Sequence, residues 1–208
     1  MSMIIGIDEV GRGPIAGPVC VCAFAMYDMP FIAREIKKIS KNKTLHTVPL
    51  VLRDSKKLSK SKREAWLSHI QIWQKKGKCD FVYTMISAKE VDAKGILPSI
   101  QKALEKSLRK LNPKQTDSIL LDGGLRAPVE FKKQKTIIKG DEKEVAIAFA
   151  SIVAKVHRDK YMIGIAKKYP GYSFEKHVGY GTKAHYIAIR KFGRTPEHRN
   201  SFLTRFVD

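Results

Sequence analysis

The chain has 208 residues, 43% of them hydrophobic, so it can bury a sizeable core as one large domain or one domain with a small appendage. Its 40 Lys and Arg residues against 20 Asp and Glu residues give a net charge of +20. A globular protein this basic usually meets a polyanion, with nucleic acid the first candidate and an anionic membrane surface the second. No apolar run reaches the roughly 18 residues of a membrane span, and a signal-peptide pattern is lacking, so we expect a cytoplasmic protein.

The chain opens with an apolar run, residues 4–7, that predicts a buried strand. Asp8 and Glu9 follow where this strand meets its turn, and a Gly-Arg-Gly sequence at 11–13 comes next. The two glycines allow the backbone to approach a ligand closely, and the guanidinium of Arg12 suits a phosphate. Carboxylates for a metal beside an arginine for a phosphate indicate metal-dependent phosphodiester chemistry. A charged surface turn is the alternative.

Residues 19–26 form a second apolar run that predicts a strand. Its Cys20 and Cys22 share one face, and we interpret them as small buried hydrophobic side chains. A basic helix is expected from about residue 31, and residues 34–63 carry a large excess of Lys and Arg. An excess of one sign favours contact with a polyanion, while a solvated charged face is the usual alternative.

Strands and helices alternate along the rest of the chain, which predicts an α/β domain. Periodicity and capping signals predict helices over 59–77, 96–111, 144–168 and 183–192, and strands over 81–86, 118–122 and 136–138. The helix over 144–168 is apolar on most sides and is expected in the core. We expect a main domain over residues 1–170 and a small helical extension over 171–208 that packs on it.

Two more acids stand, like Asp8 and Glu9, at the ends of predicted strands. Asp122 ends the strand over 118–122, and Asp141 lies between the strand over 136–138 and the core helix. Four converging carboxylates would repel one another unless cations bind, and oxygen ligands select hard ions such as Mg²⁺ or Mn²⁺. Two such ions about 4 Å apart can activate a water and stabilise a leaving oxygen. Spacing alone does not establish that the four carboxylates meet at one site, because an aspartate at a strand end also serves as a turn or cap residue.

Residues 6–14 resemble the opening motif of type 2 ribonuclease H, in its bacterial ribonuclease HII form. Similar motifs follow in order over nearly the whole chain, at 54–58, 121–123, 139–141, 150–159, 169–172, 179–182 and 196–202. The resemblance implies an RNase H-like catalytic domain with a mixed central β-sheet flanked by helices, plus a C-terminal helical segment. It also implies endonucleolytic cleavage of RNA in RNA–DNA hybrids and incision 5′ of single ribonucleotides in duplex DNA, leaving 3′-hydroxyl and 5′-phosphate ends.

The same resemblance assigns roles to individual residues. It implies metal-binding catalytic acids at Asp8, Glu9, Asp122 and Asp141, ribose reading at Gly11, Arg12 and Gly13, phosphate binding at Ser55 and Lys56, and ribose packing at Tyr180. The 2′-hydroxyl marks ribose against deoxyribose, and a site that leaves polar groups unpaired without it discriminates strongly. The arginine at 12 favours ribonuclease HII over the HIII branch, whose loop carries a lysine.

The expected partners are RNA–DNA hybrids and duplex DNA that contains ribonucleotides, without a membrane. The chain ends soon after Phe202, so we do not expect the clamp-binding tail that some relatives carry, and a monomer is expected. One alternative is a non-enzymatic RNA- or DNA-binding protein, although a pure polyanion binder gains nothing from a carboxylate cluster. The other is a different two-metal nuclease on the same fold, such as a Holliday-junction resolvase, against which the Gly-Arg-Gly loop and Tyr180 argue.

Several residues remain open between a functional and a structural role. Lys155 either faces the site or lies at the core edge, and His198 and Arg199 either contact nucleic acid or serve the fold. Trp66 and Trp73 are spaced for one face of a helix, and we interpret them as core residues rather than a base-stacking platform.

Overall fold

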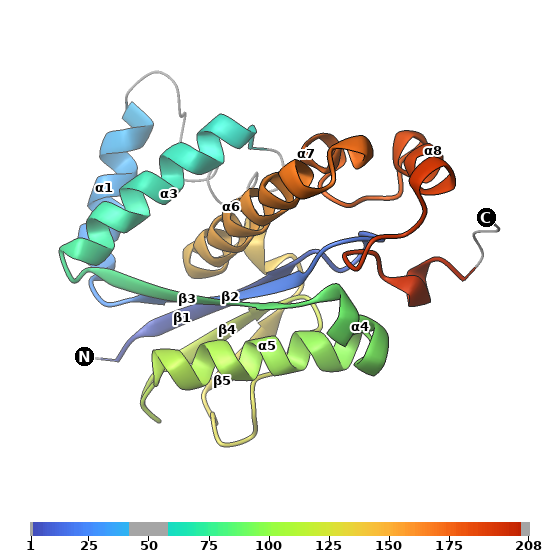
Figure 1. Cartoon of the computed structure of the whole chain (residues 1–208). Helices are drawn as coiled ribbons and strands as arrows, with labels where there is room; N and C mark the ends of the chain where they lie inside the picture. The colour runs from blue at the N-terminus through green and yellow to red at the C-terminus, as the bar shows by residue number, and fades with distance from the viewer. Residues whose placement is uncertain (1, 42–57, 205–208) are drawn as a thin grey trace.

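The computed structural model describes residues 2–41 and 58–204, so the predicted phosphate-binding residues Ser55 and Lys56 lie outside the described residues. Its centre is a five-stranded sheet in the order β3-β2-β1-β4-β5 (Figure 1). The strands are β1 Ile4–Val10, β2 Val19–Met26, β3 Cys79–Ile86, β4 Ser118–Asp122 and β5 Gln134–Ile137. β2 runs antiparallel to β1 and β3, whereas β1, β4 and β5 are parallel, so the sheet is mixed as predicted.

Helices cover both faces of this sheet. The α-helices are α1 Met29–Lys41, α3 Lys60–Lys75, α4 Ala88–Lys94, α5 Ile96–Leu111, α6 Val145–Lys168, α7 Phe174–His177 and α8 Lys183–Phe192, and the 3₁₀ turns are η1 Gly140–Glu142, η2 Pro170–Tyr172 and η3 Asn200–Phe202. α1, α3 and α6 lie on one face, and α4 and α5 lie on the other (Figure 1). None of the described helices is both long and apolar enough to cross a lipid bilayer.

Side chains of β2 alternate between two core layers, as a strand buried on both faces requires. Cys20, Cys22 and Phe24 face α3 and α6, while Val19 and Val21 face α5. Both cysteines are fully buried, which confirms their interpretation as small hydrophobic side chains.

The tryptophans of α3 complete the layer on the α6 side. Trp66 and Trp73 are almost fully buried, and both rings lie 5.7 Å from the ring of Phe149 in α6, measured between centroids. The prediction that these tryptophans belong to the core is therefore confirmed.

Helix α6 lies directly on β1 because the strand has a glycine at the crossing point. A Cβ on Gly6 would stand only 2.1 Å from the carbonyl carbon of Ala146. Any larger residue would separate strand and helix. This close contact brings the start of α6, and the η1 turn before it, to the sheet where the predicted acids lie.

The C-terminal segment is helical and packs on the loop that follows β1. Ile15, Ala16 and Met162 form one apolar cluster with Phe174 and Ile189. Residues 15–17 also bond to the C-terminal segment through the backbone, since Gly17 N–H donates to the Glu197 carbonyl. The predicted division of the chain at residue 170 stays a prediction.

Candidate active site

The parallel pairing of β1 and β4 brings two predicted acids together. Ile7 pairs with Leu121, so Asp8 and Asp122 are the next residues on adjacent strands, whose usual spacing is about 4.8 Å. Ile7 and Leu121 face the α5 side of the sheet, and alternation therefore turns both aspartates toward α6. Asp8 is buried there, with 1% of its surface exposed.

The η1 turn adds a third acid beside this pair. The backbone N–H of Gly140 donates to Oδ1 of Asp122 at 2.6 Å, so the turn is fixed to the end of β4. Asp141 follows directly and is 2% exposed. A Cβ on Gly140 would stand 2.5 Å from Cδ1 of Ile147, and the glycine lets the turn pack closely against α6.

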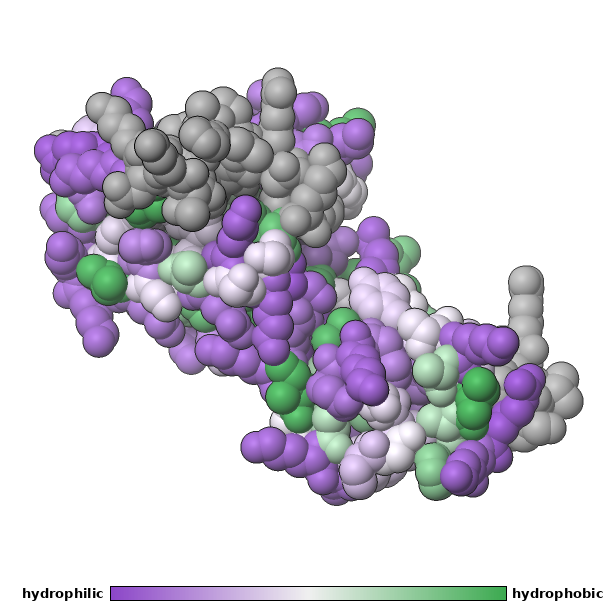
Figure 2. All heavy atoms as spheres, turned by 90° about the horizontal axis from the view of Figure 1, so that it is seen from above, coloured by the Kyte–Doolittle hydropathy of each residue, from purple (hydrophilic) through white to green (hydrophobic). Residues whose placement is uncertain are grey.

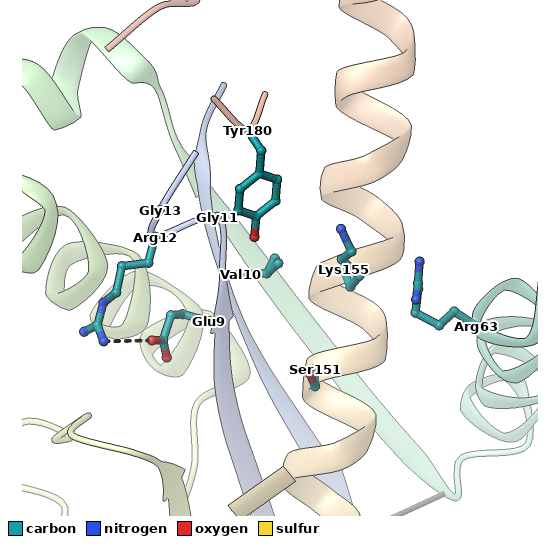
Figure 3. Close-up of a pocket in the computed structure, with 9 residues that line it drawn as sticks. All are labelled: Glu9, Val10, Gly11, Arg12, Gly13, Arg63, Ser151, Lys155 and Tyr180. Atoms are coloured by element: carbon teal, nitrogen blue, oxygen red, sulfur yellow. Dashed lines mark ion pairs between the residues drawn. The ribbon is translucent and has the colours of Figure 1, made fainter. Parts of the chain in front are cut away.

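Glu9, the fourth predicted acid, interacts with the Gly-Arg-Gly loop. Its Oε1 lies 3.5 Å from Nη1 of Arg12, and both side chains point away from α6 (Figure 3). Half of the Arg12 side chain is exposed, so this ion pair adds little to stability. The N–H of Glu9 donates to Oδ1 of Asp8 at 2.7 Å.

The backbone thus brings all four predicted acids to one end of the sheet, but their side chains are not gathered into a ligand set. Within residues 2–41 and 58–204, no three His, Cys, Asp or Glu side chains are arranged to hold a metal ion. Asp122 and Asp8 accept hydrogen bonds from backbone N–H groups, and Glu9 pairs with Arg12. By chemistry, the set fits a hard divalent cation, because its donors are all carboxylate oxygens.

A cavity of about 390 Å³ opens beside these acids, between the Gly-Arg-Gly loop and α6 (Figure 3). It is lined by Glu9, Val10, Gly11, Arg12, Gly13, Arg63, Ser151, Lys155 and Tyr180. The ring of Tyr180 points into the space between the loop and Lys155 (Figure 3), and a Cβ on Gly13 would stand 3.9 Å from that ring. The structure therefore brings the predicted ribose-reading loop and Tyr180 together around one cavity.

The wall opposite the loop is basic. Nζ of Lys155 lies 2.8 Å from one carboxylate oxygen of Asp159, and Nη2 of Arg63 lies 3.6 Å from the other. Two cations around one carboxylate leave a positive charge that suits a phosphate. Of the two roles left open for Lys155, the structure supports a place in the site. Seen from above the view of Figure 1, the surface of the described residues is predominantly hydrophilic (Figure 2).

Sequence reasoning missed Arg63 and Ser151 as site residues. Arg63 lies within a long basic run, and no motif distinguishes it from the other basic residues there. Ser151 could have been found from the sequence, because it is a polar residue in the most apolar stretch of the core helix. Burial of a polar side chain costs free energy unless it makes a hydrogen bond, so its presence there indicates a specific role.

The backbone around Tyr180 is fixed to the loop after β1. The N–H groups of Ile15 and Ala16 donate to the carbonyl of Gly179 at 2.9 and 3.1 Å. Gly179 has φ +89°, and a Cβ there would stand 2.2 Å from the Ala16 carbonyl oxygen. Only glycine combines this dihedral angle with so close an approach.

Two buried histidines hold Tyr180 from the other side. Nδ1 of His198 accepts the N–H of Thr195 at 2.8 Å, so the proton of His198 is on Nε2, which donates to Nε2 of His185 at 3.0 Å. Nδ1 of His185 then donates to the Tyr180 carbonyl at 2.8 Å. Burial lowers the pKa of both histidines to about 4, so the pair is neutral at neutral pH.

These contacts decide the open role of His198. It is 2% exposed and His185 is fully buried, so neither ring reaches a nucleic acid, and both position the Tyr180 backbone instead. No sequence pattern marks His185, because its partners are the backbone of one loop and a ring on another.

The family model described as Ribonuclease HII matches residues 5–206. The ribonuclease HII of Shouchella clausii is 42% identical over 201 residues, covering 96% of this chain and 68% of the relative. That of Chloroherpeton thalassium is 40% identical over 203 residues, covering 96% and 89%.

Solved structures share the fold. The PCNA:RNase HII complex from Archaeoglobus fulgidus gives a TM-score of 0.73 at 22% identity, covering 99% of this chain and 96% of that chain. The ribonuclease H2 from Pyrococcus horikoshii OT3 gives a TM-score of 0.67 at 22% identity, covering 96% of this chain and 93% of that chain. Bst-RNase HIII in complex with Mn²⁺ gives 0.61 at 19% identity, covering 98% and 65%.

Fold and likeness together define the class: the protein is a type 2 ribonuclease H, a hydrolase that acts as an endoribonuclease. Within that class, the chain belongs to the ribonuclease HII family. The predicted fold and enzyme class are confirmed, and the alternatives of a non-enzymatic binder and of a different two-metal nuclease are set aside.

Proposed function

We propose that this protein cleaves the RNA strand of RNA–DNA hybrids and incises duplex DNA on the 5′ side of a single embedded ribonucleotide, leaving 3′-hydroxyl and 5′-phosphate ends. One observation carries the proposal: the Gly-Arg-Gly loop and Tyr180 share a cavity with the end of the strand that carries Asp8 and Glu9. A ribose bound against the loop therefore has its phosphodiester bond beside the acids. A site built in this way joins recognition of a ribonucleotide to cleavage next to it.

Asp8, Glu9, Asp122 and Asp141 would hold the divalent metal ions in this proposal, Mg²⁺ or Mn²⁺. Such ions, when bound, supply an activated water and stabilisation of the leaving oxygen. The oxygen-only donor set supports this assignment, and so does the Mn²⁺ complex of Bst-RNase HIII, which shares the fold.

The remaining predicted residues would bind the substrate. Gly11, Arg12 and Gly13 would read the 2′-hydroxyl through their backbone, and the exposed ring of Tyr180 would pack on the ribose. Lys155 and Arg63 would hold a phosphate on the opposite wall, where their charges already lie together. Ser55 and Lys56 keep their predicted phosphate-binding role.

Other predictions about the protein's surroundings stay predictions: a cytoplasmic location, a monomer and the absence of clamp binding. The complex with PCNA is a property of the Archaeoglobus fulgidus protein.

The proposal is tested by cleavage of a duplex that carries one ribonucleotide, with Asp141→Asn and Glu142→Gln compared. The two acids are neighbours in η1, but Asp141 is buried at the site whereas Glu142 is exposed. We expect Asp141→Asn to lose at least about 100-fold in rate, because metal-assisted catalysis contributes several kcal/mol. Glu142→Gln should cut like the wild type. A wild-type rate in Asp141→Asn, or products with 3′-phosphate ends, would contradict the proposal.

A further inference from the structure

Arg199 is an arginine buried beneath the Gly-Arg-Gly loop. It is fully buried, and all its hydrogen bonds go to backbone carbonyl oxygens. Nη2 donates to Gly11 at 2.7 Å, Nη1 to Arg12 at 3.1 Å and Nε to Gly17 at 2.9 Å. The planar guanidinium thus spans the underside of the loop with three donors in a fixed geometry.

These bonds determine where the loop's own N–H groups point. In a planar trans peptide unit, the C=O and the following N–H point in opposite directions. Because the carbonyl of Gly11 points inward to Arg199, the N–H of Arg12 points outward, and the carbonyl of Arg12 likewise turns the N–H of Gly13 outward. Residues 11–13 line the cavity, whereas Arg199 is not among the residues that line it. Among the described residues, neither N–H donates to another group.

We propose that Arg199 is a positioning residue for ribose recognition, which holds the Gly11 and Arg12 carbonyls so that the N–H groups of Arg12 and Gly13 meet the 2′-hydroxyl oxygen. This inference rests on the proposed function, because it takes the loop to be the part of the protein that reads ribose. A 2′-hydroxyl accepts such hydrogen bonds, and deoxyribose has no group to accept them.

The loop needs an anchor of this kind. Gly11 has φ +90°, and glycines on both sides of Arg12 leave the backbone with many accessible conformations. The segment that carries Arg199 is itself fixed, since Arg199 N–H donates to the Ile15 carbonyl at 2.8 Å. Asp92 of α4 accepts from the N–H groups of the next two residues, at 2.7 and 3.0 Å.

A residue that served packing alone would not need a guanidinium. Burial lowers the pKa of Arg199 to about 10, so the group remains charged at neutral pH and its desolvation opposes folding. An apolar side chain of similar size would avoid this loss. An apolar side chain, however, could not direct two carbonyl groups at once.

Arg158 provides a matched control that also packs against the loop, since a Cβ on Gly11 would stand 2.3 Å from its Nε. It is also fully buried and also donates to backbone carbonyls, those of Pro18, Ala16 and Val178, but not to those of Gly11 and Arg12. Lysine keeps the charge at either position but cannot present three donors in a plane. Arg199→Lys and Arg158→Lys therefore carry a similar loss of buried hydrogen bonds.

The test measures Kd by fluorescence anisotropy for two duplexes, identical except for one ribonucleotide. It uses an Asp141→Asn parent, whose cleavage is expected to be at least about 100-fold slower, without added metal ions. We expect the parent to prefer the ribonucleotide duplex, and Arg199→Lys to reduce that preference on the order of tenfold, the value of about one hydrogen bond, with Kd for the all-DNA duplex unchanged. Arg158→Lys should lower Tm similarly and keep the preference. An undiminished preference in Arg199→Lys, or an equal loss in both variants at matched folded fraction, would overturn the proposal.

The outcome for the parent separates this inference from the proposed function. A parent without any preference for the ribonucleotide duplex would refute ribose reading itself, and the role of Arg199 with it. If Arg199→Lys does not fold, the inference is tested by NMR on the Asp141→Asn parent. The amide protons of Arg12 and Gly13 should shift on titration with the ribonucleotide duplex and not with the all-DNA duplex. Equal shifts with both duplexes would overturn the inference.

Discussion

Replacement of Asp122 separates its proposed catalytic role from its structural one. Oδ1 of Asp122 accepts the N–H of Gly140 at 2.6 Å, a charge-assisted hydrogen bond that fixes η1 to β4. Such bonds contribute about 1.5–3 kcal/mol when buried, and the lower part of this range applies because Asp122 is half-buried. Asp122→Ala removes this bond, whereas Asp122→Asn keeps an oxygen in the same place.

We therefore expect Asp122→Ala to lose about 1–2 kcal/mol of unfolding free energy, or roughly 3–6 °C in Tm for a chain of this size. Asp122→Asn should stay within about 1 kcal/mol of the wild type, because it keeps the acceptor and relieves repulsion from Asp8 and Asp141. Both variants should lose at least about 100-fold in cleavage rate, since neither supplies a carboxylate to a metal.

Calorimetry and single-turnover cleavage of a duplex with one ribonucleotide measure the two effects on the same samples. Near-normal turnover in Asp122→Asn would remove Asp122 from the catalytic set. Equal losses of stability in Asp122→Asn and Asp122→Ala would show that the bond to Gly140 does not hold η1 in place.

Three further predictions follow from single contacts. Gly6→Ala should lower the unfolding free energy by about 3 kcal/mol or more, because its Cβ would meet the Ala146 backbone at 2.1 Å. Denaturant titrations measure this loss, and an unchanged midpoint would refute the contact. The free energy of unfolding should fall as pH drops from about 6.5 to about 4, because the pKa of His185 and of His198 is lower in the folded than in the unfolded chain. In this range the unfolded chain binds the protons, and each histidine contributes a loss of up to roughly 1.4 kcal/mol per pH unit. A slope that His185→Gln leaves unchanged would contradict that assignment. Tyr180→Ala should slow cleavage at a single ribonucleotide more than cleavage within a continuous hybrid, and equal losses at matched folded fraction would count against ribose packing.

Local patterns predicted most of the elements at nearly their observed bounds. The helices over 96–111 and 183–192 and the strand over 118–122 have the predicted limits, because apolar periodicity and end signals are local in sequence. Helix α4 was missed, since seven residues give little periodicity. Its cap was visible, as Ser87 accepts the N–H of Glu90 in a Ser-x-x-Glu sequence.

The acids could be selected from sequence, but their convergence could not. Asp8 and Asp122 become neighbours only through the parallel pairing of β1 and β4, which joins segments more than a hundred residues apart. Sequence marked where strands end and left their order in the sheet undetermined.

The supporting residues were beyond prediction for a different reason. Arginines are mostly exposed, and the sequence left the role of Arg199 open between contact with nucleic acid and a place in the fold. Its carbonyl partners at Gly11 and Arg12 lie nearly the length of the chain away, and backbone acceptors leave no side-chain pattern to find. The partners of His185 lie near it in the sequence, but one is again a backbone acceptor, the Tyr180 carbonyl, and the other is a ring nitrogen of His198.

The most direct measurement compares two end-labelled duplexes, one with a single ribonucleotide and one with deoxyribose at that position, incubated with this protein and Mg²⁺. If the loop at 11–13 reads ribose beside the acids of β1 and β4, the first duplex is cut once, on the 5′ side of the ribonucleotide, and the second stays intact. A chelator should abolish the cut. Cleavage of both duplexes at similar rates, or a cut that persists with the chelator, would contradict the central claim.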